Sequence, residues 1–320
     1  MKKIEYYQKK LYDGKLLQKE ELMELSEEPL EPLCEAADEI RRHFCGDVFD
    51  LCAVISAKGG RCTEDCAFCP QSGISKAIDT IPEFPLLVTE DLVRDAKEKE
   101  RKGIMAYGIV ASGRVISGHE AKQLAKSLVK LRKETNLRLC ASLGLLDRQK
   151  LERLRDAGLQ MVHNNLESSE RHFRSICTTH TYEEKRTVIR AAKNAGLSVC
   201  SGALFGIGES MEDRIELALN ERSLGVTSVP VNMLDPAPGT PLEHSAPLDV
   251  DDMRRIVAVF RFALPAAFIR LAAGREYLED QGRSCFLSGA NAAISGDFLT
   301  TMGISIETDG NMLREIGYRV

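Results

Sequence analysis

Residues 49–57, which read Phe-Asp-Leu-Cys-Ala-Val-Ile-Ser-Ala, are followed after a Gly59-Gly60 turn by the stretch Arg61-Cys-Thr-Glu-Asp-Cys-Ala-Phe-Cys-Pro70. The first stretch is apolar and has the length of a buried strand. The second carries three thiols in the spacing Cys-x3-Cys-x2-Cys. Cysteine thiolates are ligands of zinc and of iron–sulfur clusters. The sequence therefore predicts a strand that leads into a metal-binding loop.

The number of thiols in this loop narrows the choice of metal. Structural zinc is closed by four protein ligands, and no neighbouring residue of the sequence adds a fourth to Cys62, Cys66 and Cys69. An iron–sulfur cubane held by three thiolates instead leaves one iron free to bind a reactive molecule. A disulfide or a zinc knuckle is the alternative.

Seven further apolar runs follow, and amphipathic charged segments separate them, for example a helix expected over residues 89–101 with Thr89 as its N-cap. Short apolar runs that alternate with helical segments are typical of βα units and a parallel sheet. Eight such units predict an α/β fold of the (β/α)8 TIM-barrel type. The eight expected strands are residues 49–57, 104–111, 137–143, 161–166, 198–205, 228–234, 267–272 and 284–290.

The chain divides into three predicted parts. Residues 1–46 are charged, carry leucines at loosely helical spacing, and are expected to form an N-terminal helical cap. Residues 47–296 are expected to form the barrel, and residues 297–320 a C-terminal segment that closes it.

Composition limits the partners. The 320 residues carry a net charge of -5 with a pI near 5.8, which argues against nucleic acid and anionic membrane as partners. The ten cysteines and the polar first residues predict a protein of the reducing cytoplasm without a signal peptide. The most apolar stretch, residues 256–273, is interrupted by charges and a proline, so no membrane span is expected.

Cys140 and Cys200 lie inside the third and fifth expected strands, whose alternate residues face the barrel interior. A buried free cysteine is usually a small hydrophobic residue. Arg270, in the seventh run, needs a partner if it is buried. That partner is either a metal centre held by the thiols or a carboxylate.

The cysteine loop resembles that of the radical S-adenosylmethionine (SAM) superfamily, including the aromatic Phe68 before the third thiol. A closer resemblance, to the biotin synthase family, extends from about Asp47 to Thr301. It rests on residues 58–72, 178–182, 200–202, 231–234, 239–242, 270–276, 285–291 and 299–301.

This resemblance implies a radical SAM sulfurtransferase that inserts sulfur between the methyl and methylene carbons of dethiobiotin. It implies a [4Fe-4S] cluster on Cys62, Cys66 and Cys69, and an auxiliary iron–sulfur cluster that supplies the sulfur. Its other implied residues are Cys140, Cys200 and Arg270 for the auxiliary cluster, Asn165 and Asn232 for the ureido ring, Thr300 and Thr301 for the substrate carboxylate, Glu167 for the SAM ribose, and Lys185, where an arginine for the SAM carboxylate is common.

One position departs from the family. The first of three cysteines that usually hold a [2Fe-2S] auxiliary cluster falls on Gly108, so the cluster is expected to use another thiol or to be a variant type. Cys52, Cys177 and Cys285 are the candidates. Cys52 is preferred because it lies on the neighbouring strand, and because Ser56 and Lys58, which share its face, are polar, as residues that face the barrel interior and its mouth would be.

The expected partners are dethiobiotin, a flavodoxin- or ferredoxin-type electron donor, and a second copy of the chain in a homodimer. The alternatives are a related radical SAM enzyme of the hydrogenase maturase or methylornithine synthase type, and a non-catalytic iron–sulfur carrier or sensor.

Overall fold

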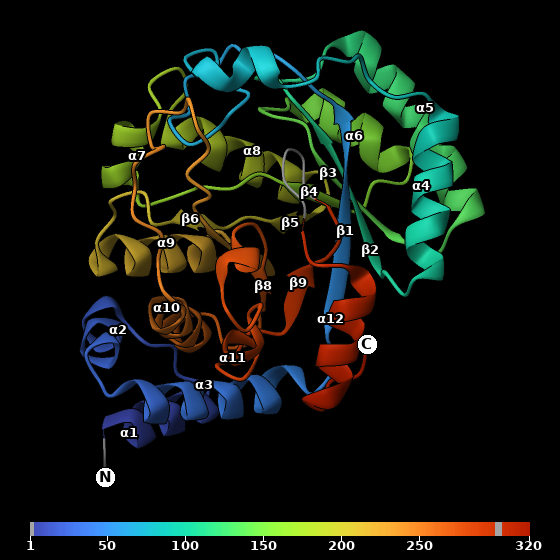
Figure 1. Ribbon diagram of the computed structural model, residues 1–320. Coiled ribbons are helices and arrows are strands. Elements are labelled where there is room, and N and C mark those ends of the chain that lie inside the picture. The colour runs from blue at the N-terminus through green and yellow to red at the C-terminus, as the bar shows by residue number, and fades with distance from the viewer. Residues whose placement is uncertain (1–2, 298–302) are drawn as a thin grey trace.

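Parallel strands form a closed barrel surrounded by helices in the computed structural model, which describes residues 3–297 and 303–320 (Figure 1). Except for β5 and β6, each strand pairs with its neighbour in the chain, and β9 pairs with β1 to close the barrel. Two segments, β5 and β6, both pair with β7 and occupy one barrel position, so the nine segments of the described chain make eight positions and confirm the predicted fold. The strands are β1 (Asp50–Lys58), β2 (Ala106–Ala111), β3 (Arg138–Ser142), β4 (Met161–His163), β5 (Ser198–Cys200), β6 (Ala203–Phe205), β7 (Ser228–Met233), β8 (Phe268–Leu271) and β9 (Ala292–Ile294).

The eighth strand is not where the sequence predicts it. The predicted strand at 284–290 overlaps a single helical turn, α11 (Arg283–Phe286), which lies between the left-handed residues Gly282 and Gly289. Cys285 and Phe286 bury their side chains from this turn. A short apolar run cannot be assigned to strand or buried helix by periodicity alone. The strand itself, β9, is only three residues long and follows this run.

The break between β5 and β6 is caused by a close approach to β7. A Cβ atom on Gly202 would lie 2.0 Å from the carbonyl oxygen of Pro230, so only glycine fits there. The backbone N–H of Gly202 donates instead to the side-chain oxygen of Asn165, at 3.0 Å. This bond holds Asn165, which follows β4, against the break at the carboxyl end of the barrel.

Helices cover the outside of the barrel and bury apolar stripes against it. The predicted helix over residues 89–101 is present as α4, but its N-cap is Val88, and the Thr89 hydroxyl pairs with Ser127 at 2.8 Å. The helices are α1 (Lys3–Tyr12), α2 (Lys19–Ser26), α3 (Leu30–Cys45), α4 (Thr89–Arg101), α5 (Gly118–Glu134), α6 (Arg148–Asp156), α7 (Glu170–Ile176), α8 (Tyr182–Asn194), α9 (Met211–Ser223), α10 (Val250–Ala263), α11 and α12 (Ile306–Glu315).

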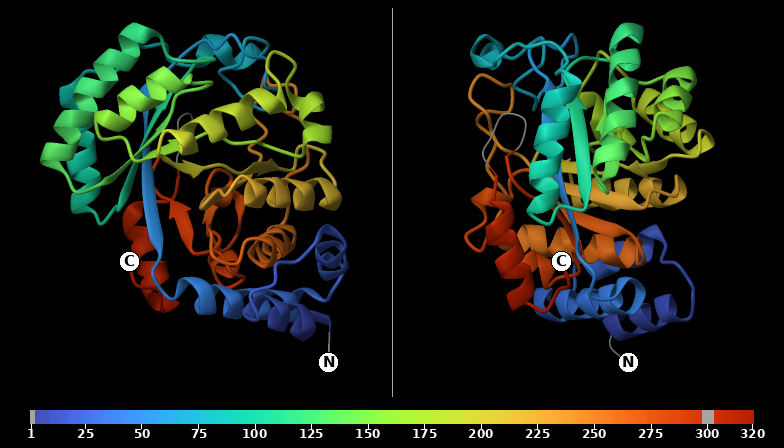
Figure 2. Two further views of the ribbon diagram at one scale, coloured as in Figure 1. Left: turned by 180° about the vertical axis from the view of Figure 1, so that it is seen from behind. Right: turned by 90° about the vertical axis from the view of Figure 1, so that its right-hand side faces the viewer.

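The two ends of the barrel are different. Helices α1–α3 and α12 lie at the end where β1 begins, with α3 packed against α10 and α2 against α9 (Figures 1 and 2). There the carbonyl oxygen of Arg319 accepts a hydrogen bond from the N–H of Phe49 at 2.9 Å. The loop after β1, which carries the three cysteines, lies at the opposite end. In the described residues no helix combines the length and hydrophobicity that crossing a membrane requires.

Candidate active site

A cavity of about 700 Å³ occupies the barrel and opens at the carboxyl ends of the strands. Its wall is mostly apolar. Thiols occur at both ends: Cys69 of the loop lies at the mouth, and Cys52, Cys140 and Cys200 lie deeper, on β1, β3 and β5. A mostly apolar cavity with a few converging polar groups at this end of a (β/α)8 barrel is where such folds place their active sites.

The cysteine loop is held in shape by its own backbone. The N–H of Cys69 donates to the carbonyl oxygen of Cys66 at 3.1 Å, and the N–H of Cys62 donates to that of Gln71 at 2.9 Å. The Gln71 side chain accepts from the N–H of Gly60 at 3.0 Å. Three soft donors on one loop at the cavity mouth suit an iron–sulfur cluster with one open iron.

Two acidic residues between the cysteines fasten this loop to the segment after α7. Asp65 accepts hydrogen bonds from the N–H groups of Thr178 and Thr179, at 2.9 and 3.1 Å. Burial opposes ionisation of Asp65, but the bonds from Thr178 outweigh it and hold the pKa of the carboxyl below its usual value. Glu64 binds the His180 ring at 2.6 Å and Arg114 at 2.9 Å. The acidic pair is therefore the anchor of the cysteine loop.

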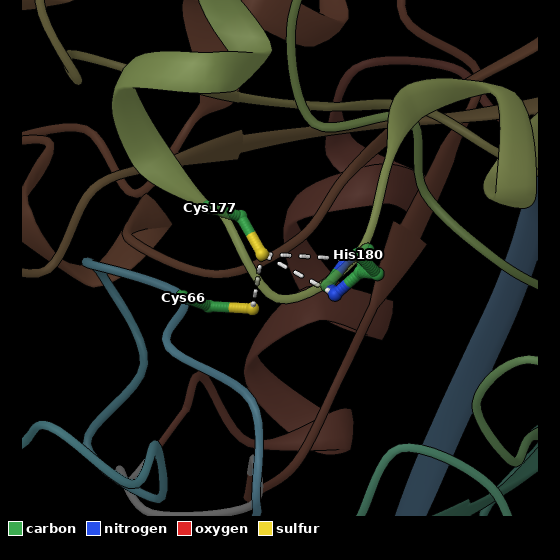
Figure 3. A group of neighbouring side chains, drawn as sticks. All are labelled: Cys66, Cys177 and His180. Carbon is green, nitrogen blue, oxygen red and sulfur yellow. Dashed lines mark hydrogen bonds between the residues drawn. The ribbon is translucent and has the colours of Figure 1, made fainter.

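This anchoring brings Cys177 and His180 to Cys66, as Figure 3 shows. The Cys177 sulfur lies 3.9 Å from the Cys66 sulfur and 3.2 Å from Nδ1 of His180. The sequence offers no further cysteine or histidine close to the triad along the chain. The fold nevertheless brings Cys177 and His180 next to Cys66. Cys177 does not line the cavity, and neither does Cys285, which is fully buried elsewhere.

The thiols of Cys52, Cys140 and Cys200 form the floor cluster. Burial raises the pKa of Cys52 to about 11 and also raises the pKa values of Cys140 and Cys200. The charges of Cys200 and Cys52 raise the pKa of Cys140 further, so the three groups are close enough to interact. Arg270 opposes these shifts at all three thiols. A metal centre would fit this group, because its positive charge stabilises the thiolate form that burial disfavours.

Arg270 has the carboxylate partner that the sequence left open as an alternative. Its guanidinium binds Asp50 at 2.9 Å, and both residues are at most 3% exposed. Arg138 also binds Asp50, so two guanidinium groups share one carboxylate beside the floor cluster. The residual positive charge still favours an anionic centre. Asp50 was not predicted because it lies within an apolar run.

Gly108 faces the cavity between β1 and β3. Its register partners are Val54 and Cys140. A Cβ atom on Gly108 would lie 2.9 Å from Cγ1 of Val54, closer than normal contact. Val54 therefore occupies the space into which a cysteine side chain at this position would extend.

The predicted ligand-binding residues of the rim already bond to the backbone. Asn232 donates to the carbonyl oxygen of Ala203 at 2.8 Å and accepts from the N–H of Ala273 at 3.2 Å. Asn165 accepts from Gly202 and donates to Glu167 at 3.3 Å. An amide side chain has two donor hydrogens and two acceptor positions, so each can still bind a ligand.

Glu167 and Lys185 complete the rim. Glu167 has a left-handed φ of 70°, a conformation that is costly for a residue with a side chain and that clusters at functional sites. Lys185 donates to the carbonyl oxygen of Asn165 at 2.9 Å. The predicted residues Thr300 and Thr301 lie outside the described residues.

His163 is a cavity residue that the sequence reasoning missed. It lines the cavity on the face of β4 that also presents Met161, and no hydrogen-bond partner is found for it among the described residues. Burial, followed by the charges of Lys185 and Arg270, lowers the pKa of His163 to about 4, so the ring is neutral at physiological pH. Because residues two apart in an extended segment share one face, His163 could have been predicted from its position two residues before Asn165.

Comparisons with known proteins agree with this geometry. A family model described as the Radical SAM superfamily matches residues 57–219, and one described as the Biotin and Thiamin Synthesis associated domain matches residues 230–319. A biotin synthase of Brachyspira hyodysenteriae is 50% identical over 317 residues, covering 99% of this chain and 95% of the relative. One of Akkermansia muciniphila is 48% identical over 303 residues, covering 94% of each.

Solved structures share the fold at lower identity. A methylornithine synthase superimposes with a TM-score of 0.83 at 21% identity, covering 98% of this chain and 96% of that one. A hydrogenase maturase of Carboxydothermus hydrogenoformans gives 0.80 at 18%, covering 98% and 78%. At such identities the likeness concerns the barrel alone, whereas the curated relatives match nearly the whole chain. The chain therefore belongs to the biotin synthase family of the radical SAM superfamily.

Proposed function

We propose that the cavity binds dethiobiotin between two iron–sulfur centres, and that the chain forms biotin by inserting sulfur between the methyl and methylene carbons. The observation that carries the proposal is that one cavity meets thiols at two levels: Cys69 of the cysteine loop at the mouth, and Cys52, Cys140 and Cys200 on the floor. When bound, SAM and the cluster at the mouth supply a 5′-deoxyadenosyl radical, and the auxiliary cluster supplies sulfur.

The mouth set is Cys62, Cys66 and Cys69. Its role is to hold the [4Fe-4S] cluster at the rim, where Glu167 and Lys185 are suited to the SAM ribose and carboxylate. Burial raises the pKa of Glu167, and the charge of Lys185 opposes this shift. In either protonation state the Glu167 side chain can accept hydrogen bonds from ribose hydroxyls.

The floor set is Cys52, Cys140 and Cys200, with Arg270 as a further ligand. Of the three candidates to replace the missing thiol at Gly108, only Cys52 lines the cavity. This placement supports Cys52 as the third thiolate. Because Cys52 pairs with Ala106, one pleat below Gly108, the third thiolate would approach from a lower level of the barrel. A cluster other than the usual [2Fe-2S] type fits this change.

The substrate would lie between the two sets. Asn165 and Asn232 use one part of their hydrogen-bonding capacity on the backbone and are thereby oriented, which leaves the rest for a ureido group. Thr300 and Thr301 would bind the carboxylate. The apolar wall excludes water from the carbon that reacts, which protects a reactive radical from side reactions.

The electron donor is proposed to be a flavodoxin or ferredoxin, the oligomer a homodimer and the compartment the cytoplasm. The acidic composition and the ten cysteines support the compartment. Analytical ultracentrifugation of the purified protein tests the homodimer, for which a monomer at micromolar concentration is the contrary result.

The activity is tested with the anaerobically reconstituted protein. Addition of dethiobiotin should stimulate 5′-deoxyadenosine formation and yield biotin, whereas an analogue without the ureido group should do neither. Cys66→Ala should abolish 5′-deoxyadenosine formation. Biotin formation by that variant, or no response to dethiobiotin in the parent, would contradict the proposal.

A further inference from the structure

The proposed reaction uses Cys66 but does not explain why Cys177 and His180 lie against it. One ligand atom from each residue lies within 4.8 Å of the other two, and all three face one another (Figure 3). Cys177 and His180 are buried, at 5% and 7% exposure. Two thiols and an imidazole in one small space are a typical donor set for zinc.

The distances agree with a single tetrahedral ion. With Zn–S bonds of about 2.3 Å and Zn–N bonds of about 2.0–2.1 Å, tetrahedral angles place two sulfurs about 3.8 Å apart and a sulfur and a nitrogen about 3.6 Å apart. The two sulfurs of Cys66 and Cys177 are 3.9 Å apart. The Cys177 sulfur lies 3.2 and 3.7 Å from Nδ1 and Nε2 of His180.

A second feature, independent of these distances, is the carboxylate behind the histidine. Glu64 lies 2.6 Å from Nδ1 of His180, and Arg114 and Thr179 hold that carboxylate in place at 2.9 and 3.0 Å. A histidine that binds a metal through one ring nitrogen usually donates the other N–H to a carboxylate. Glu64 therefore takes Nδ1 and leaves Nε2, which lies 3.7 Å from the Cys177 sulfur, as the nitrogen for the metal.

We propose that, in the protein without its mouth cluster, Cys66, Cys177 and His180 bind one divalent zinc ion. Both cysteines bind as thiolates, so binding releases any thiol proton to solvent and requires no oxidant or reductant. Asp65 also reaches the site, because its Oδ1 lies 3.2 Å from the Cys177 sulfur. It is not counted as a ligand, since the same oxygen already accepts from Thr178 and Thr179. Water takes the fourth position.

The site shares Cys66 with the proposed [4Fe-4S] ligands, so zinc and the cluster exclude each other. Zinc bound there withholds one of three thiolates from the cluster and slows its assembly. The inference of a zinc site rests on contacts of this chain alone and stands whether or not the proposed reaction is correct.

Anaerobic titration of the reduced apoprotein with Co²⁺, followed by thiolate-to-metal absorption and then by displacement with Zn²⁺, tests the site. One equivalent should bind. Cys66→Ser, Cys177→Ser and His180→Ala should each weaken binding by more than the roughly 10–100-fold expected for Glu64→Gln, because a direct ligand contributes more than the group that orients it.

Cys69→Ser and Cys45→Ser are the matched controls and should bind within about twofold of the parent. Cys69 belongs to the mouth set but not to the zinc site, and Cys45 is a free thiol elsewhere. Loss of binding in Cys69→Ser with retention in Cys177→Ser would place the ion in the mouth set and overturn the proposal. Loss of metal binding in Cys140→Ser alone would place the ion in the floor cluster and would also overturn the proposal.

Circular dichroism of each variant separates misfolding from loss of a ligand. If His180→Ala misfolds, the weaker metal binding expected of Glu64→Gln, which keeps all three ligands, still tests the role of His180. A second readout is the rate of iron uptake into protein preloaded with zinc. Zinc should slow uptake in the parent and not in Cys177→Ser. Equal slowing in both would contradict the proposal.

Discussion

Glu221, on α9 behind the break between β5 and β6, is a buried acid without a counter-ion among the described residues. Ser201 donates to one of its oxygens at 2.7 Å, and the other has no partner in the described residues. Burial raises the pKa of Glu221 to about 8 from its ordinary value of 4.5, although the bond from Ser201 opposes the shift. Between these two pH values the folded protein keeps a proton that the unfolded chain releases, so stability falls as pH rises through this window.

Glu221→Gln should remove this pH dependence, because the amide keeps an oxygen for Ser201 and cannot ionise. The free energy of unfolding of the variant should exceed that of the parent at pH 8 and match it near pH 5. Each tenfold change in the acid dissociation constant between the folded and unfolded states corresponds to about 1.4 kcal/mol. Chemical denaturation of the apoprotein at several pH values measures the difference, and parallel pH profiles for the two proteins would show that the assignment is wrong.

Asn232→Ala should weaken dethiobiotin binding to the holoprotein by roughly 1–3 kcal/mol, the cost of leaving a buried polar group unsatisfied. Calorimetric titration provides the measurement. Asn164→Ala is a matched control, because Asn164 also donates to a backbone carbonyl, that of Lys185 at 3.3 Å, but does not line the cavity. Equal losses in the two variants would mean that Asn232 acts on the fold and not on the substrate.

At the scale of elements, alternating apolar and charged segments were sufficient to predict the number of barrel positions and the bounds of α4. The position of the eighth strand was not predictable, because residues 284–290 are as apolar as a strand and β9 is short. Cys140 and Arg270 were singled out because thiols and a guanidinium inside apolar runs need a partner. Asp50, the partner of Arg270, lies in an apolar run as well, but it was missed because its pairing joins β1 to β8 past β9 and depends on strand register.

The packing of β1 against β2 provides a test of why glycine stands at position 108, where the family usually has a cysteine. Gly108→Cys should destabilise the apoprotein by about 1–3 kcal/mol, as overpacked residues do, because the new Cβ atom meets Val54 at 2.9 Å. Adding Val54→Ala should restore part of that loss, although Val54→Ala alone should be destabilising. Denaturation of the parent, both single variants and the double variant measures the coupling. Additive effects would mean that Val54 does not fill the cysteine position.

At the scale of the whole molecule, the barrel brings thiols from distant parts of the chain to two levels of one cavity. The triad of the mouth was evident from sequence because its members are close along the chain. The proximity of Cys177 to Cys66 was not, since it depends on how Asp65 and Glu64 anchor one loop to another. The floor cluster was predictable only in part. The sequence shows which strand carries each thiol, but not how far apart the thiols lie in the barrel.

We propose that the mouth cluster cleaves SAM and the floor cluster supplies sulfur, and the variant Cys52→Ser tests this division most directly. Cys52→Ser and the buried control Cys285→Ser are each reconstituted anaerobically with iron and sulfide. We expect Cys52→Ser to keep the mouth cluster and SAM cleavage but to lose the auxiliary iron and biotin formation, while Cys285→Ser keeps all four. Iron content, electron paramagnetic resonance spectra and biotin yield of Cys52→Ser that all match the parent would contradict a floor cluster held by Cys52, Cys140 and Cys200.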